Sequence, residues 1–364
     1  MRVLVAGGTS TSPGGWIAVR AVAEYLASCS ARSTLIVPSG ADMDGLPRGP
    51  RYRARGRAIA LAQELVGLHR SVDVYIGMAD RLPLIRRRST WRIMIAQNPH
   101  LYRGVSPSST RAGRLLDRFR VALAVYSANH ADAVVTATRA TASELAARCR
   151  VEPGRVSVVP IPAVGIDRQR GVHRDVIQRI AMVGAARSYK RFEWAIREID
   201  AWAAMRPETV KIEHYGPLYG DGPAGALRRA AETTSSVAVE LHGQVGHSEV
   251  IAGLADADLF VFPSRTESYG VPLVEALSIG VPTICSDIPQ FREIGGSIPV
   301  YIDGSTGSLA EALAAVEPRG VREALSRASR TAFRGASGWN VLSGGATNPR
   351  LVRDQSGETQ ELLG

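Results

Sequence analysis

The chain of 364 residues is poor in lysine, cysteine and aromatic residues, and it lacks long apolar runs. Its three cysteines, Cys29, Cys149 and Cys285, are too scattered for a disulfide framework or a metal site, which favours a reducing compartment. No run approaches the roughly 18 apolar residues of a membrane span. The N-terminus has no basic segment followed by an apolar one, so we expect no signal peptide and a cytoplasmic location.

Lysine is almost absent: only two of the 44 basic residues are lysines, and the rest are arginines. The basic residues are also unevenly distributed. Residues 1–172 hold 25 arginines against 11 acidic residues, whereas residues 173–364 hold 19 basic against 23 acidic residues. The first half is therefore expected to meet an anionic partner. An aromatic content of 6% and the lack of a recognised binding motif argue against nucleic acid, despite a pI near 10.0.

Part of this positive charge is concentrated in one group of arginines, which can be interpreted in two ways. The group is a solvated face, or it docks on the inner membrane surface or on an acidic, lipid-linked acceptor, as basic patches do on anionic lipid. Its members are Arg48, Arg51, Arg53, Arg55, Arg57, Arg86, Arg87 and Arg88.

Short β-branched runs alternate with helical patterns along the chain, which is typical of βαβ units and parallel sheets. The pattern restarts after the proline-rich segment 160–165, so we expect two doubly wound, Rossmann-like α/β domains, residues 1–172 and 173–331, facing one another across a cleft. Residues 332–364 are rich in glycine and serine and are expected to form an irregular tail. Ligands of such sheets bind at the carboxyl ends of the strands.

The most informative segment runs from residue 257 to residue 277. An apolar strand ends at Pro263, a polar loop follows, and a helix is expected to begin near Pro272. The amides of a helix start, with Gly270 allowing close backbone approach, form an anion site. Glu275 is the one charged residue in an otherwise apolar stretch. It either complements the helix dipole or accepts two hydrogen bonds from a sugar.

Glu267 and Glu275 form an E-x7-E spacing within the sequence P-S-R-T-E-S-Y-G-V-P-L-V-E-A. This segment closely resembles the donor-site signature of family-4 glycosyltransferases, which are retaining enzymes with the GT-B fold. The resemblance covers about residues 237–296. It implies that Glu275 holds the ribose, that Glu267 contacts the transferred hexose, and that backbone amides receive the hexose and the diphosphate, from Ser268, Tyr269, Gly270 and Val271.

A cationic group that stabilises the departing diphosphate is expected just after the first strand of the second domain. The family resemblance assigns this role to Lys190. The arginine that usually follows the glycine is replaced by Ala185, so Arg187 or Arg191 is the expected substitute.

In the first domain the resemblance assigns Gly14 and Gly15 to the donor phosphate and acceptor, and His100 to the hexose. The alternatives are an ordinary strand-to-helix turn and a structural histidine. Asp132, Thr138 and Glu144 are interpreted as scaffold.

The sequence thus predicts a metal-independent, retaining glycosyltransferase that moves a hexose from a nucleotide-diphosphate-sugar to a hydroxyl, with no cofactor beyond that co-substrate. A catalytically silent nucleotide-sugar-binding protein of the same fold stays an alternative, and a sugar-nucleotide epimerase is a weaker one. A nicotinamide-dependent oxidoreductase is disfavoured. The glycines after the first strand do not fit G-x-G-x-x-G, and no acidic residue ends the second strand.

Overall fold

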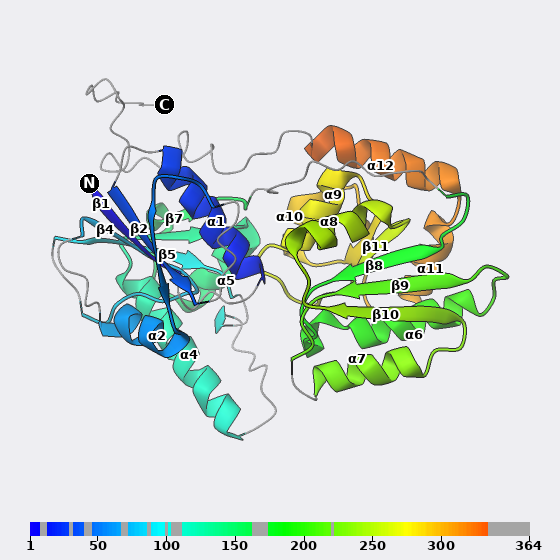
Figure 1. The fold of residues 1–364 in the computed structure, drawn as a ribbon, viewed down its shortest axis with the longest axis horizontal. Coiled ribbons are helices and arrows are strands. Elements are labelled where there is room, and N and C mark those ends of the chain that lie inside the picture. Colours follow the sequence, from blue (N-terminus) through cyan, green and yellow to red (C-terminus); the bar gives the residue numbers. More distant parts are fainter. Residues whose placement is uncertain are drawn as a thin grey trace.

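The computed structural model describes residues 1–7, 13–28, 32–39, 46–66, 72–85, 89–98, 101–102, 111–161, 174–219 and 222–333. These residues form two α/β domains, each built on one parallel sheet, and the two lie side by side (Figure 1). The predicted fold class is confirmed. The proline-rich segment 160–165 at the predicted domain boundary falls mostly outside the described residues, as does the tail after residue 333.

The first domain contains a seven-stranded parallel sheet in the order β3-β2-β1-β4-β5-β6-β7. Its helices are α1, α2, α4 and α5, and a helical turn η1 precedes the last strand. The bounds are β1 Arg2–Ala6, α1 Pro13–Ser28, β2 Arg32–Pro38, β3 Arg51–Arg55, α2 Arg57–Val66, β4 Val74–Gly77, β5 Trp91–Ala96, α4 Arg111–His130, β6 Ala133–Thr136, α5 Arg139–Arg148, η1 Pro153–Arg155 and β7 Val156–Val158.

The second domain contains a six-stranded parallel sheet in the order β10-β9-β8-β11-β12-β13. Seven helices and one helical turn, η2, alternate with the strands among the described residues. The bounds are β8 Arg179–Val183, η2 Ser188–Lys190, α6 Phe192–Ala203, β9 Val210–Tyr215, α7 Pro223–Glu232, β10 Val237–Gly243, α8 His247–Asp256, β11 Leu259–Phe262, α9 Val271–Ile279, β12 Thr283–Ser286, α10 Pro289–Gly295, β13 Val300–Ile302, α11 Ser308–Val316 and α12 Arg319–Phe333.

The central strands are largely apolar because helices cover both faces of each sheet. In β11, Phe260 and Phe262 pack on the face that meets α9, while Leu259 and Val261 pack on the other face. All four side chains are buried. This double-sided burial explains why β11 reads as an uninterrupted apolar run, and it holds the end of the strand rigidly beside the loop that follows.

The arginine-rich segment near residue 50 is the main element that the sequence patterns did not predict. It forms β3, the edge strand of the first sheet, parallel to β2. Arg51 and Arg53 are exposed there, and charged side chains on an edge strand oppose pairing with another chain. Arg86, Arg87 and Arg88 lie outside the described residues. Two arginines of the group therefore have a structural role that needs no anionic partner.

The domains meet along a seam between α5 of the first and α10 of the second, together with the loop before α9. At this seam the Glu293 carboxylate accepts hydrogen bonds from the amides of Arg139 and Ala140, at 2.7 and 3.0 Å. Such a carboxylate satisfies free donors at the start of α5 and complements its dipole. Gln290 donates to Glu144 at 2.8 Å. Residues of both domains thus fix how the two sheets face one another.

Within the described part of the chain, no helix is long and apolar enough to cross a membrane.

Candidate donor site

The loop between β11 and α9 lies at the carboxyl end of its strand and against the first domain. Gly270 caps α9 with φ +98°, and Pro272 occupies the first turn. The hydroxyls of Thr138 and Thr141, from the first domain, lie 3.1 and 2.9 Å from the Ser268 carbonyl oxygen and can donate to it. The side chains of Tyr269 and Val271 are buried at the seam. The loop is therefore positioned by both domains.

The backbone amides of this loop are available to a ligand. Within the part of the chain that the structure describes, no acceptor is found for the amides of Ser268, Tyr269, Gly270 and Val271. Unsatisfied amides at a helix start, combined with the positive end of the helix dipole, attract anions. This is the arrangement that the sequence predicts for binding a diphosphate or sugar hydroxyls.

Replacing Gly270 by alanine should destabilise the protein by about 3 kcal/mol, because it combines backbone strain with overpacking. A Cβ atom at Gly270 would lie 2.7 Å from Cε1 of Phe291, at a backbone angle that side chains rarely adopt. Gly307 is a matched control, because it is also left-handed, with φ +85°, but has open space around its Cβ position. Gly307→Ala should cost only about 1 kcal/mol. Urea unfolding measures both, and equal losses would contradict the packing argument.

Glu275 is buried in the second turn of α9, and its one described side-chain partner is His247 at the start of α8. The imidazole Nε2 lies 2.7 Å from Glu275 Oε1, and the histidine is partly exposed. The buried carboxylate is therefore paired with a partly exposed histidine, which a ligand can displace. Sequence patterns did not single out His247, because its pairing with Glu275 spans 28 residues and two helices.

Lys190 and Glu267 form an ion pair, although 77 residues separate them in the sequence. The ammonium also lies 4.7 Å from the centre of the Phe262 ring, at the end of β11. Gly184 leaves room for this lysine, since a Cβ there would lie 3.3 Å from Lys190 Nζ. The structure thus brings together the two residues that the sequence assigns to the diphosphate and the hexose.

The arginines near Lys190 differ in their surroundings. Arg187 is exposed, with its guanidinium 5.4 Å from the centre of the Tyr219 ring. Arg191 instead donates to the Gly304 carbonyl at 2.9 Å and stacks on Trp194. Burial and then the nearby Arg265 lower the pKa of Arg191. Among the described residues, Arg191 therefore has a carbonyl partner and Arg187 has none.

Arg265 is a further cation that sequence patterns did not assign. It is exposed in the loop after β11, and its amide donates to the Tyr189 carbonyl at 2.8 Å. This bond ties the loop that carries Glu267 to the loop that carries Lys190. The positive charges of both loops therefore lie along one edge of the sheet, at the carboxyl ends of β8 and β11.

His214 lies buried in β9 beside this cationic edge. Burial and then the charge of Lys190 lower its pKa from 6.5 to about 4. Phe192 packs against it, with the ring centres 4.7 Å apart. The imidazole is therefore neutral at neutral pH, and it adds no charge to the site.

The lowered pKa of His214 makes stability depend on pH. The unfolded chain binds a proton near pH 6.5 and the folded chain only near pH 4, so stability is lost as pH falls through this window. The expected loss is about 3 kcal/mol. His214→Gln should remove this part of the pH dependence, whereas His130→Gln, at the exposed end of α4, should keep it. Urea unfolding between pH 7 and pH 4 tests this; parallel curves for wild type and His214→Gln would contradict it.

In the first domain, Gly14 and Gly15 fall in the first turn of α1. A small cavity lies at the carboxyl ends of β5 and β6 and is lined by both domains. Its lining includes Gln97, Thr136, Ile161 and Ser268. The predicted hexose contact, His100, lies outside the described residues. The roles of these residues stay predictions.

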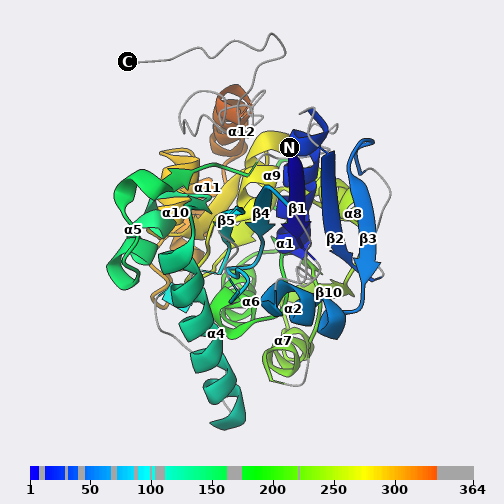
Figure 2. The same ribbon diagram turned by 90° about the vertical axis from the view of Figure 1, so that its left-hand side faces the viewer.

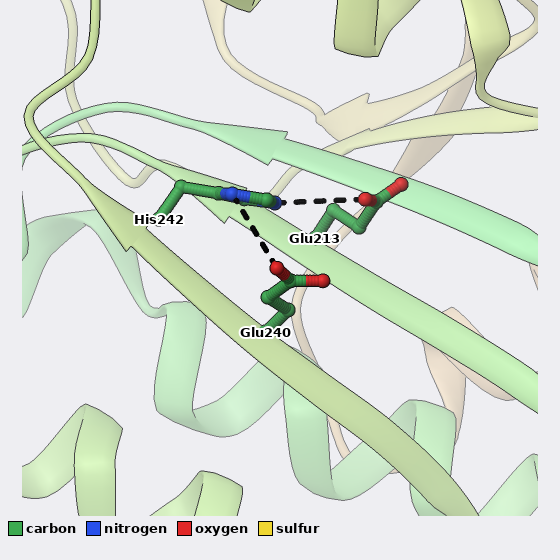
Figure 3. A group of neighbouring side chains, drawn as sticks. All are labelled: Glu213, Glu240 and His242. Carbon is green, nitrogen blue, oxygen red and sulfur yellow. Dashed lines mark ion pairs between the residues drawn. The ribbon is translucent and has the colours of Figure 1, made fainter.

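One group of side chains in the described residues has ligand atoms close enough to hold a metal ion: Glu213, Glu240 and His242, within 4.8 Å of one another (Figure 3). They lie on β9 and β10. Lys211 forms ion pairs with both carboxylates, at 3.2 Å from Glu213. Because this ammonium already compensates the negative charge, we interpret the group as an ion-pair network. This group does not test the prediction that the reaction requires no metal, which stays a prediction.

Comparison with known proteins agrees with this geometry. Residues 177–318 match the family described as "Glycosyl transferases group 1". A D-inositol 3-phosphate glycosyltransferase of Streptomyces avermitilis is 26% identical over 271 residues, which is 68% of this chain and 54% of that protein. The chain thus spans about half the length of that curated relative.

Two solved structures share the fold over nearly the whole chain. Sucrose-phosphate synthase of Thermosynechococcus elongatus has a TM-score of 0.70 at 15% identity, covering 94% of this chain and 96% of its own. HepE of Anabaena, solved with UDP and glucose, has a TM-score of 0.66 at 13% identity, covering 91% and 94%. The chain therefore has the GT-B fold, and its second domain carries the sequence pattern of group 1 glycosyl transferases.

Proposed function

We propose that the protein is a retaining glycosyltransferase that moves a hexose from a nucleotide-diphosphate-sugar to an acceptor hydroxyl. The observation that carries the proposal is that three features lie in or beside the loop before α9: the amides of residues 268–271, which have no acceptor among the described residues, the buried Glu275 carboxylate, and the Lys190–Glu267 pair. Sugar hydroxyls satisfy carboxylates, whereas amides and ammonium groups satisfy a diphosphate. One nucleotide-sugar would meet all three.

In the proposed complex the ribose hydroxyls replace His247 as the partners of Glu275. The diphosphate takes the ammonium of Lys190 from Glu267, helped by Arg187 and the amides of the loop. Glu267 then accepts hydrogen bonds from the hexose. In the free protein Glu275 is hydrogen-bonded to His247 and Lys190 is paired with Glu267, so none of these three buried or partly buried charges is isolated before the donor binds.

In the proposed reaction the acceptor oxygen forms a bond to the anomeric carbon on the face from which the diphosphate leaves. The carbon–oxygen bond to the diphosphate breaks, and the diphosphate carries away the electron pair. Charge therefore builds on the leaving group, which Lys190 and the loop amides stabilise. The departing diphosphate accepts the proton of the acceptor hydroxyl. This scheme requires no metal ion.

The donor is proposed to be a UDP-sugar first, because HepE of Anabaena was solved with UDP and glucose. The test incubates the full chain with UDP-, GDP- and ADP-sugars and follows nucleotide release by phosphorus NMR. At least one donor should be hydrolysed slowly without an acceptor. Binding without any release would support the silent nucleotide-sugar-binding protein instead. Neither binding nor release with all three nucleotides would contradict both proposals.

A further inference from the structure

Helix α4 exposes large apolar side chains on the surface of the first domain. Leu115 is 69% exposed, Phe119 59% and Leu116 49%. They lie within five consecutive residues in the N-terminal half of the helix, R-L-L-D-R-F-R from Arg114 to Arg120. Exposed aliphatic and aromatic side chains are common singly, but a contiguous group marks an interaction surface.

The apolar residues lie on the side of α4 that faces away from the protein. Successive residues of a helix are turned by about 100°, so Leu115 and Phe119 share one face. The opposite face carries Asp117, Ala124 and Ala128, all buried. The helix therefore has apolar residues on two opposite sides, and only one of these sides packs into the core of the domain.

Arginines flank this exposed apolar face. Arg111, Arg114, Arg118 and Arg120 are all exposed. The one acidic residue of the helix, Asp117, is buried and pairs with Arg120 at 3.2 Å. Exposed apolar side chains bordered by arginines are typical of helices that lie in the interface of a membrane, with the apolar face in the acyl boundary and the cations at the phosphates.

The position of α4 leaves this face accessible. In both views the N-terminal half of α4 projects past the other labelled elements of the first domain (Figures 1 and 2). The surface continues toward the C-terminal half, where the Tyr126 hydroxyl lies 3.4 Å from the Leu84 carbonyl. Leu84 and Ile85 are also exposed. A flat surface could thus approach α4 without contacting the donor loop.

We propose that this face of α4, defined by Leu115, Leu116 and Phe119 with Arg111 and Arg118, docks on an anionic lipid surface. The positive charge of the arginines decides between a second copy of the chain and a lipid surface as the binding partner. A second copy of the chain would bring arginines against arginines with no exposed acid on the helix. Anionic headgroups instead match the cations, while the acyl boundary takes the apolar side chains. The arginine-rich strand β3 carries positive charge but no comparable group of exposed apolar side chains. We therefore assign the membrane contact to α4 rather than to β3.

The test is flotation of the full chain with vesicles of pure phosphatidylcholine or of phosphatidylcholine with phosphatidylglycerol. Wild type should float only with the anionic vesicles. Arg111→Gln with Arg118→Gln should weaken this binding about 30-fold. Leu115→Ser with Phe119→Ser should weaken it about tenfold or more at unchanged charge. Matched controls on the second domain, Arg228→Gln and Met205→Ser, should bind as wild type does, since both residues are exposed there.

Each outcome decides for or against the proposal. Loss in both α4 variants with retention in the controls supports it. Absence of flotation by wild type overturns it, as does an equal loss in Arg228→Gln, which would indicate unspecific charge attraction. Concentration-dependent dimerisation that Leu115→Ser with Phe119→Ser abolishes would assign the face to a second copy and overturn it too. Circular dichroism of each variant confirms that the chain is folded. The result does not depend on the proposed sugar transfer.

Discussion

Replacing Lys190 by alanine should lower kcat about 100- to 1000-fold, with a smaller effect on the KM for the donor. The ammonium is the one lysine at the carboxyl edge of the second sheet, and it pairs with Glu267 in the free protein. Its charge is needed most when the diphosphate departs, because negative charge accumulates there. Steady-state kinetics with the donor found by the screen measures the effect.

The second lysine of the chain provides the control. Lys211 is also paired with carboxylates, those of Glu213 and Glu240, but it lies on β9 and outside the donor loop. Lys211→Ala should therefore leave kcat within about twofold of wild type, since these ion pairs lie away from the donor loop and any loss falls on stability. Lys190→Arg should retain part of the activity because it keeps the charge. An equal loss in Lys190→Ala and Lys211→Ala would contradict the role of Lys190.

Replacing Glu275 by alanine should raise the KM for the donor about 100-fold, while kcat changes little. Two hydrogen bonds to a carboxylate together contribute about 3 kcal/mol or more, and this contribution is the same in ground and transition states. The expectation rests on the burial of Glu275 and on its single described side-chain partner, His247. Donor titrations in the turnover assay separate KM from kcat.

His247→Ala is the matched control for this prediction. It removes the partner that occupies Glu275 in the free protein but keeps the carboxylate. The KM for the donor should then stay equal or fall, because the ribose no longer displaces an imidazole. If His247→Ala raised KM as much as Glu275→Ala, the histidine rather than the carboxylate would hold the nucleotide. A Glu275→Ala variant with an unchanged KM would remove the ribose assignment altogether.

The fold and the centre of the donor site could be predicted from the sequence because their signals are local. The buried strand β11, the glycine at the start of α9 and Glu275 all lie within 17 consecutive residues, 259–275. Strand β11 is a continuous apolar run because helices cover both faces of the second sheet, and runs of this kind are the signal from which parallel sheets were predicted.

Contacts between distant segments could not be predicted from these patterns. Thr138 and Glu144 read as scaffold, yet they contact Ser268 and Gln290 across the seam, 130 and 146 residues away. The strand β3 was missed because alternating arginines hide the apolar signal of an edge strand. The exposed face of α4 could have been recognised, since Leu115 and Phe119 share a helix face with flanking arginines. From the sequence alone, however, α4 resembles an ordinary amphipathic helix, because the sequence does not show which of its faces packs on the domain.

Hydrogen–deuterium exchange with and without nucleotide tests the central claim most directly. The full chain is incubated with saturating UDP, GDP or ADP in separate samples. We predict that one of them slows amide exchange in residues 263–277 and 184–191, and leaves α4 unchanged. A donor site built on Lys190, Glu267 and Glu275 would be contradicted if none of the three nucleotides slowed exchange in these segments relative to the free chain. Protection confined to the first domain would contradict it as well.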